Sequence, residues 1–121
     1  MGYESRFYIV DKKNSSYEDD YGYFWAEKIA IFNMSCVGNH LMSNIKKYSK
    51  TDVYIYEGDE KITEDDYGDP LIEIPINDMI DLLEETIDKE EHYRRNMPFL
   101  KLLRGFNLSE WNNLVVLHYG Y

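Results

Sequence analysis

The first third of the chain alternates between apolar and polar positions in a way that predicts two paired strands. Residues Tyr3 to Val10 are rich in aromatic and β-branched side chains interrupted by polar ones, a pattern typical of a strand. Residues Asp11 to Asp20 are polar and contain turn-forming asparagine and serine, so we expect them to form the loop of a hairpin. Residues Tyr21 to Met34 return as a long second strand, with a bulge expected near Glu27, where the alternation is interrupted.

The middle of the chain shows shorter patterns. Apolar residues at helical spacing between Asn39 and Tyr48 favour a short helix or a turn. Residues Asp52 to Glu57 predict a third strand, and the segment 57–70 predicts a loop or an excursion hairpin in which Lys61 to Thr63 form a short strand. Residues Leu71 to Pro75 are expected to add an edge strand, since proline is tolerated at the edge of a sheet.

The last third of the chain changes to helical spacing. Asn77 is the predicted N-cap of a helix with one apolar face and one acidic face. A second helix is expected to start after Asn96, with a proline in its first turn, and to stop at Gly105. A short third helix that opens at 109–111 and a final strand from Val115 to Tyr119 complete the pattern. Together these elements predict an α+β fold: an antiparallel sheet of four or five strands with two or three helices packed on one face.

The size and composition are those of a folded protein with a single domain, residues 1–121. Apolar residues make up 44% of the chain and aromatic residues 16%, unlike a disordered chain, despite a net charge of −10. The N-terminus has no apolar stretch like that of a signal peptide, and no apolar run approaches the length of a membrane span. The single cysteine, Cys36, cannot form an internal disulfide. These features favour a cytoplasmic protein.

The negative charge is concentrated in one part of the sequence. The segment 57–91 holds fifteen acidic residues and two basic ones, whereas the rest of the chain holds eight acidic and eleven basic residues. This excess argues against binding DNA, RNA or an anionic membrane, because those polyanions would be repelled. It favours a basic partner. The residues expected to bind that partner lie in the segment 57–69 and on the outer face of the first long helix. They are Glu57, Asp59, Glu60, Glu64, Asp65, Asp66, Tyr67, Asp69, Asp78, Asp81, Glu85 and Asp88.

The acidic helix face has two interpretations. Its carboxylates recur about every 5 Å along the axis, comparable to the phosphates of a nucleic-acid strand, so the row can enter a groove built for a phosphate backbone. However, Glu85 with Lys89 and Glu90 with Arg94 stand at the i, i+4 spacing of an ordinary solvated helix face. The acidic loop has no such compensating bases nearby.

One pentapeptide, Glu-Asp-Asp-Tyr-Gly, occurs twice, at 18–22 and at 64–68. Five residues are too few to indicate a duplicated domain, so we interpret the repeat as two acidic turns whose sequences are the same by coincidence. Each copy is still expected to place a pair of carboxylates beside a tyrosine ring at the tip of a loop.

The sequence contains no catalytic motif. Glycine-rich phosphate-binding loops and the Gly-x-Ser-x-Gly pattern are missing, and Cys36 with His40 is the one close thiol–imidazole pair. The segment 59–69 lacks the spacing of a calcium loop, and the three histidines, His40, His92 and His118, lack zinc spacing. We therefore predict no metal and no cofactor, and favour binding over catalysis.

Three segments carry a resemblance to other proteins. Residues Tyr3 to Val10, Trp25 to Ala30 and Trp111 to Gly120 resemble small uncharacterised proteins encoded by phages of low-GC Gram-positive bacteria. Small acidic phage proteins of this size include anti-CRISPR and other anti-defence inhibitors, some of which occupy the nucleic-acid channel of a host nuclease by mimicking DNA. The resemblance implies a phage protein that acts in the cytoplasm of a bacterial host cell.

The sequence therefore favours a non-enzymatic inhibitor that binds a basic nucleic-acid-binding cleft of a host defence protein, such as a Cas nuclease, without contacting nucleic acid or membrane itself. Two alternatives stay open. One is a small hydrolase or nuclease that uses its carboxylates to hold a divalent ion. The other is a small-molecule sponge or a phage structural protein. Whether the chain forms a homodimer is also left open.

Overall fold

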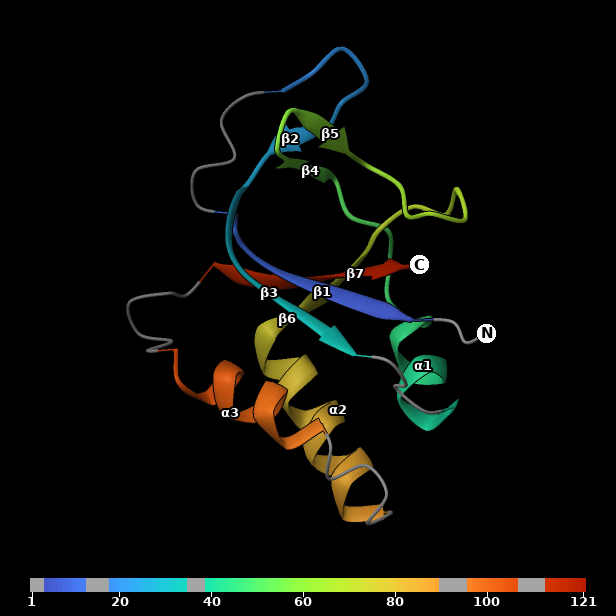
Figure 1. Ribbon diagram of the computed structural model, residues 1–121, viewed down its shortest axis with the longest axis vertical. Helices are drawn as coiled ribbons and strands as arrows, with labels where there is room; N and C mark the ends of the chain where they lie inside the picture. Colours follow the sequence, from blue (N-terminus) through green and yellow to red (C-terminus); the bar gives the residue numbers. More distant parts are fainter. Residues whose placement is uncertain (1–3, 13–17, 35–38, 90–95, 107–112) are drawn as a thin grey trace.

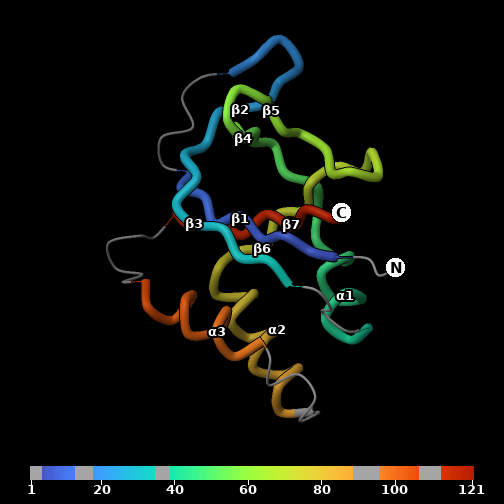
Figure 2. The backbone as a smooth tube through the Cα atoms, viewed as in Figure 1, coloured from blue at the N-terminus to red at the C-terminus, as the bar shows by residue number. Residues whose placement is uncertain are grey.

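A four-stranded antiparallel sheet forms the middle layer of the computed structural model, which describes residues 4–12, 18–34, 39–89, 96–106 and 113–121 (Figure 1). Its strands lie in the order β3-β1-β7-β6. Their bounds are β1 Ser5–Asp11, β3 Glu27–Met34, β6 Ile72–Pro75 and β7 Leu114–Gly120. Figure 2 shows the first and last described residues lying next to each other, where Glu4 and Tyr121 exchange two backbone hydrogen bonds of 2.8 and 2.9 Å. The predicted α+β fold is confirmed.

The central strand β1 is buried on both faces. Phe7 and Ile9 point toward the helices, whereas Tyr8 and Val10 belong to a second apolar cluster on the opposite face. All four side chains are fully buried. Because both faces of this strand are covered, its sequence reads as a nearly continuous apolar run from Phe7 onward.

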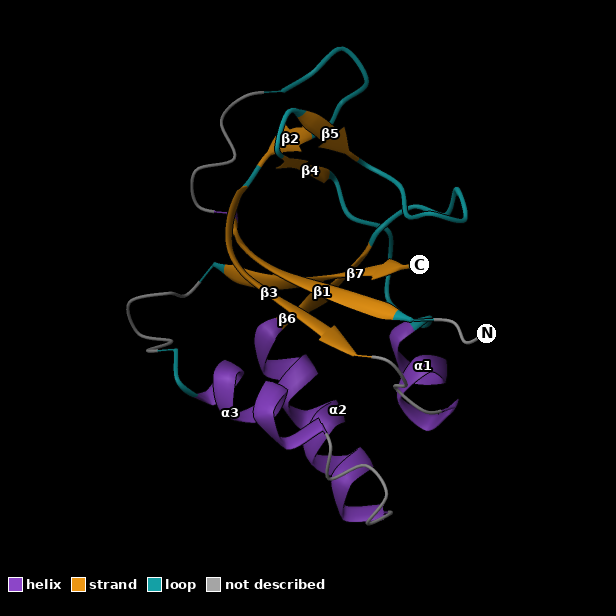
Figure 3. Cartoon of the chain, in the orientation of Figure 1, coloured by secondary structure: helices purple, strands orange, loops and turns teal. Residues whose placement is uncertain are grey.

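Three helices cover one face of this sheet, as Figure 3 shows. They are α1 Asn39–Ile45, α2 Ile76–Lys89 and α3 Met97–Arg104. Phe99 of α3 anchors the layer: its ring stacks on Phe32 with a centroid separation of 4.7 Å and contacts Phe7 at 5.0 Å. Met79 and Leu83 of α2 are fully buried in the same cluster.

A second, smaller sheet covers part of the other face and was not predicted. It consists of β2 Phe24–Trp25, β4 Val53–Glu57 and β5 Glu60–Ile62 in the order β2-β4-β5. Strands β2 and β4 are parallel, whereas β4 and β5 form a hairpin. Val53 and Ile55 pack with Tyr8 and Leu117 of the large sheet between the layers.

The long strand predicted from Tyr21 to Met34 is divided between the two sheets. The backbone of Ala26, which is buried, donates a hydrogen bond of 3.1 Å to the carbonyl of Tyr54. Residues before Ala26 pair with β4, and residues after it pair with β1. The pairing with β1 skips Ile29, which places the predicted bulge two residues beyond Glu27.

Most of the helix and strand boundaries predicted for the last third of the chain agree with the structure. Strand β7 and helix α3 lie where they were predicted, with Asn96 at the N-cap and Gly105 at the C-cap of the helix. Helix α2 begins at Ile76, so Asn77 lies inside the first turn and the predicted N-cap is wrong by two residues. The predicted helix at 109–111 lies outside the described residues. No helix in the described ranges is long and apolar enough to cross a membrane.

Candidate interaction surface

The two Glu-Asp-Asp-Tyr-Gly segments fold into the same turn. In the first, the Asp19 carboxylate accepts backbone hydrogen bonds from Tyr21 at 2.9 Å and Tyr23 at 2.8 Å. In the second, the Asp65 carboxylate accepts from Tyr67 at 2.9 Å and Asp69 at 3.0 Å. A short aspartate side chain satisfies backbone donors two and four residues further along, which fixes the turn locally. The sequence repeat is therefore also a structural repeat.

The backbone of the two turns is equivalent as well. The amides of Asp19 and Asp65 donate to the carbonyls of Tyr23 and Asp69, each at 2.8 Å. The glycine that ends each pentapeptide has a left-handed backbone, with φ of 84° at Gly22 and 80° at Gly68. This conformation is inexpensive for glycine and costly for residues with a Cβ atom.

Alanine at either glycine is expected to lower the free energy of unfolding by about 1–2 kcal/mol, because the left-handed backbone is strained for alanine. Space is not the cause: a Cβ atom at Gly22 would come no closer than 4.0 Å to its nearest neighbour, and one at Gly68 would meet nothing within that distance. Urea unfolding of the Gly22→Ala and Gly68→Ala variants measures the loss. Asparagine tolerates this backbone better, so the matched Asn variants should lose clearly less; equal losses for Ala and Asn would contradict the explanation.

Each turn directs one aspartate inward and its tyrosine outward. Asp19 and Asp65 are bonded to backbone amides, so of the two adjacent aspartates in each turn only the second is exposed beside the tyrosine. The tyrosines are the exposed part: Tyr21 is 86% exposed and Tyr67 56% exposed. Asp20, next to Tyr21, is exposed as well. An exposed carboxylate therefore accompanies an exposed phenol ring at the tip of each turn.

Strand β5 lies between the two turns and holds the first of them in place. Lys61 of β5 forms an ion pair with Asp19, and its ammonium group lies 4.2 Å from the centroid of the Tyr54 ring. This pair lowers the pKa of the Asp19 carboxyl, and the hydrogen bonds from Tyr23 and Tyr21 add to the effect. Strand β5 therefore binds the carboxylate that accepts the backbone hydrogen bond of Tyr21.

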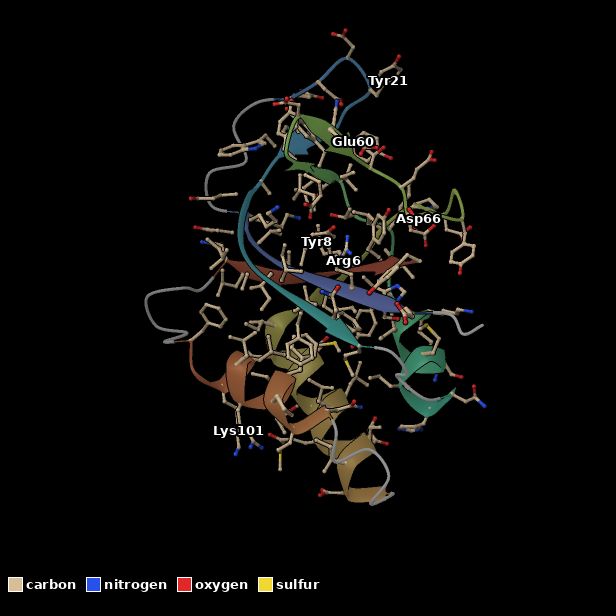
Figure 4. The ribbon with its side chains drawn as sticks, in the orientation of Figure 1. Arg6, Tyr8, Tyr21, Glu60, Asp66 and Lys101 are labelled. Carbon is tan, nitrogen blue, oxygen red and sulfur yellow. The ribbon has the colours of Figure 1, made fainter. Side chains whose placement is uncertain are left out.

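The second turn is attached to the large sheet. The Tyr119 hydroxyl donates a hydrogen bond to Asp66, which raises the pKa of Tyr119, and the amide of Asp66 donates to the carbonyl of Gly120 at 3.1 Å. Figure 4 shows Tyr21, Glu60 and Asp66 along the same side of the molecule. A hollow shared by Tyr21 and Glu64 and another shared by Glu60 and Asp66 connect the two turns.

We call this surface the turn face. It consists of exposed side chains from the two turns and from β5: Asp20, Tyr21, Glu60, Glu64, Asp66 and Tyr67. In the described part of the chain, Lys61 is the one cation that lines the two connecting hollows, and it is bound to Asp19. Asp59 and Asp69 are exposed at the margins of the turn face.

The acidic residues predicted on the helix do not join this surface. Helix α2 lies on the opposite side of the large sheet from β5 (Figure 1). Asp78 accepts a hydrogen bond of 3.0 Å from Tyr48, and Glu85 lies 3.4 Å from His40. The predicted single acidic surface is therefore two separate regions, and the helix region has part of its charge in contacts within the protein.

Two other predicted binding residues have roles inside the fold. Glu57 is half-buried and lies 3.4 Å from the ammonium group of Lys28. Asp65 is used by its own turn. Conversely, the sequence prediction omitted Asp20 and Tyr21, because it relied on the charge excess of one segment. The repeated pentapeptide was the signal that could have added them.

A serine–histidine hydrogen bond between β1 and β7 is enclosed by the fold. Ser5 Oγ lies 2.8 Å from His118 Nε2, but Ser5 is 1% exposed and His118 4% exposed. A substrate has no access to that hydroxyl, so the pair is a packing contact between β1 and β7. The thiol–imidazole pair of the sequence depends on Cys36, which lies outside the described residues, as does His92. No group of three or more potential metal ligands comes together among the described side chains.

Comparison with other proteins gives no further assignment. No known protein family matches the chain, and no match was found among curated proteins or among solved structures. The function has to be inferred from the residues of the chain itself.

Proposed function

We propose that this protein is a non-enzymatic binding protein whose turn face docks onto a lysine- and arginine-lined surface of a nucleic-acid-binding protein. The observation that carries the proposal is the structural repeat of the two turns. Each turn uses one aspartate to fix its backbone and presents an exposed tyrosine beside an exposed carboxylate. Tyrosine provides a rigid, amphipathic contact at a low cost in conformational entropy, and the carboxylates provide charge complementarity to a basic partner.

The charge balance of the turn face supports the same proposal. The residues of this face are acidic or aromatic, and the neighbouring Lys61 is already bound to Asp19. Accumulated like charge destabilises a folded protein through self-repulsion. A basic partner would relieve that repulsion on binding and would accelerate association at low salt.

A phosphate-binding cleft is the partner site that fits this surface best. Such a cleft holds lysine and arginine side chains that normally neutralise phosphates, and carboxylates can take the place of those phosphates. Of the two acidic regions, we assign the docking to the turn face alone, because the acidic face of α2 lies on the opposite side of the sheet from β5. We propose a nuclease of a bacterial defence system, such as a Cas nuclease, as the partner class, with binding in the bacterial cytoplasm.

The test compares two double variants that remove the same amount of charge. The turn-face variant combines Asp20→Asn with Glu64→Gln, and the helix variant combines Asp81→Asn with Asp88→Asn; all four side chains are exposed. Each immobilised protein is incubated with a lysate of a low-GC Gram-positive bacterium, and bound proteins are eluted with duplex DNA. We expect the parent and the helix variant to retain DNA-binding proteins that the duplex displaces, and the turn-face variant to retain about tenfold less, a loss of ~1.4 kcal/mol.

Two results would overturn the proposal. One is a parent protein that captures nothing that duplex DNA can displace. The other is a turn-face variant that captures as much as the helix variant. A Tyr21→Ser variant adds a test that is independent of charge, since we expect it to weaken capture while leaving the net charge unchanged.

A further inference from the structure

A separate hollow of about 380 Å³ lies beside the second turn, where the end of α1 approaches the start of β6. Its apolar lining comes from Met42 of α1, from Pro70 and from Ile72 of β6. The buried His118 of β7 also lines it. A volume of this size falls in the range of small-molecule sites, which combine an apolar lining with a few polar groups.

The charged side chains around this hollow stand apart from one another. Lys46 and Lys50 come from the segment that follows α1, whereas Asp65 and Asp69 come from the second turn. No ion pair between these lysines and aspartates occurs in the structure of the described residues. By contrast, Lys12, Lys28, Lys61 and Arg104 each form an ion pair with an acidic residue.

This separation leaves both signs of charge available at one hollow. Here two positive and two negative side chains line one hollow without an ion pair between them. The formal charge of the lining is zero, because burial lowers the pKa of His118 to about 4 and keeps its imidazole neutral near pH 7.

The two aspartates differ in availability. The Asp65 carboxylate already accepts hydrogen bonds from the amides of Tyr67 and Asp69. Asp69 is exposed, and its backbone is held by the turn, so its carboxylate is positioned by a rigid loop. Asp69 is therefore the carboxylate that can bind a cationic group, with the two lysines available for an anionic one.

We propose that this hollow binds a zwitterionic small molecule of the amino-acid class. The carboxylate of the ligand lies against Lys46 and Lys50, its ammonium group lies against Asp69, and its apolar side chain packs on Met42 and Ile72. A ligand with both charges can pair with the lysines and with the aspartate of the lining. A simple anion would also face the two aspartates, and a simple cation would also face the two lysines. Binding of this ligand does not depend on the proposed function, in which the turn face binds a protein partner.

The experiment is an NMR titration of the full chain with three related probes. L-Phenylalanine has both charges, 3-phenylpropionate lacks the ammonium group, and phenethylamine lacks the carboxylate. We expect saturable shifts of the amide signals of Lys46, Lys50, Asp69, Ile72 and His118 with phenylalanine, and affinities at least about tenfold lower for the other two probes, equivalent to ~1.4 kcal/mol. The other amino acids are then ranked in the same way to identify the preferred side chain.

Variants with matched controls locate the site. Lys46→Ala and Asp69→Asn are expected to weaken phenylalanine binding by about tenfold. Lys47→Ala removes a neighbouring exposed lysine that does not line the hollow, and Asp59→Asn removes an exposed acid of the β4–β5 turn. These two controls should bind within about twofold of the parent. The proposal is overturned if no amino acid gives saturable shifts, if the three probes bind equally, or if Lys46→Ala and Lys47→Ala have the same effect.

Discussion

Replacing Phe99 with alanine is expected to lower the free energy of unfolding by about 3–5 kcal/mol, the usual loss for a buried aromatic residue. Phe99 is fully buried, and its ring contacts both Phe32 and Phe7. The substitution would remove the stacking contact and leave a cavity between α3 and the large sheet. Urea unfolding followed by circular dichroism measures the change. A loss of this size would be a large part of the total stability of a protein of this length.

The control for this prediction lies on the same helix. Lys101 is exposed on the outer side of α3, as Figure 4 shows, and Lys101→Ala should change the free energy of unfolding by less than about 0.5 kcal/mol. Phe99→Leu keeps most of the apolar volume and should fall between the two. If Phe99→Ala and Lys101→Ala had similar effects, the packing of α3 on the sheet would be different from that described above.

Acidification is expected to destabilise the protein through His118. Burial lowers the pKa of this imidazole from 6.5 to about 4, with Lys46 lowering it further and Asp65 opposing the shift. The folded state therefore binds a proton less readily than the unfolded state. The neutral ring contributes about 3 kcal/mol of stability above pH 6.5, and that contribution is lost as the pH falls from 6.5 to 4. About 2 kcal/mol of it should be gone by pH 5.

The measurement is the free energy of unfolding in urea at pH 7, 6 and 5. A His118→Gln variant is expected to be less stable at pH 7, because it alters the packed contact with Ser5, and to lose clearly less stability than the parent between pH 7 and pH 5. A parent and a His118→Gln variant with the same slope between pH 7 and pH 5 would show that His118 is not the group responsible.

Much of the secondary structure could be predicted from local patterns. Helix α3 has a proline in its first turn and a glycine at its C-cap, and both signals act within a few residues of the helix ends. Strands β1, β4 and β7 are rich in β-branched and aromatic residues, which favour extended backbone wherever they are placed. The start of α2 was missed by two residues, since helix ends are weakly determined by sequence.

The candidate surface was predicted less completely than the fold. The repeated pentapeptide identified two acidic turns with tyrosines at their tips, because an aspartate side chain and a left-handed glycine shape a turn without help from the rest of the protein. The charge excess of one segment, by contrast, suggested that the loop and the helix α2 form one surface. Charge summed along a sequence does not indicate on which side of a sheet each segment lies.

The sequence by itself therefore determined the local structures: the main strands, helix α3 and the two acidic turns. The tertiary structure decided how these elements face one another. It divided the strand at Ala26 between two sheets, formed the parallel pair of β2 and β4, placed α2 and β5 on opposite sides of the large sheet, and brought Lys46 and Asp69 to one hollow. The physical reason is how far apart in the sequence the interacting residues lie. Turns and helix ends depend on hydrogen bonds between residues a few positions apart, whereas the side of the sheet that a segment covers depends on burying apolar surface against residues far away in the chain.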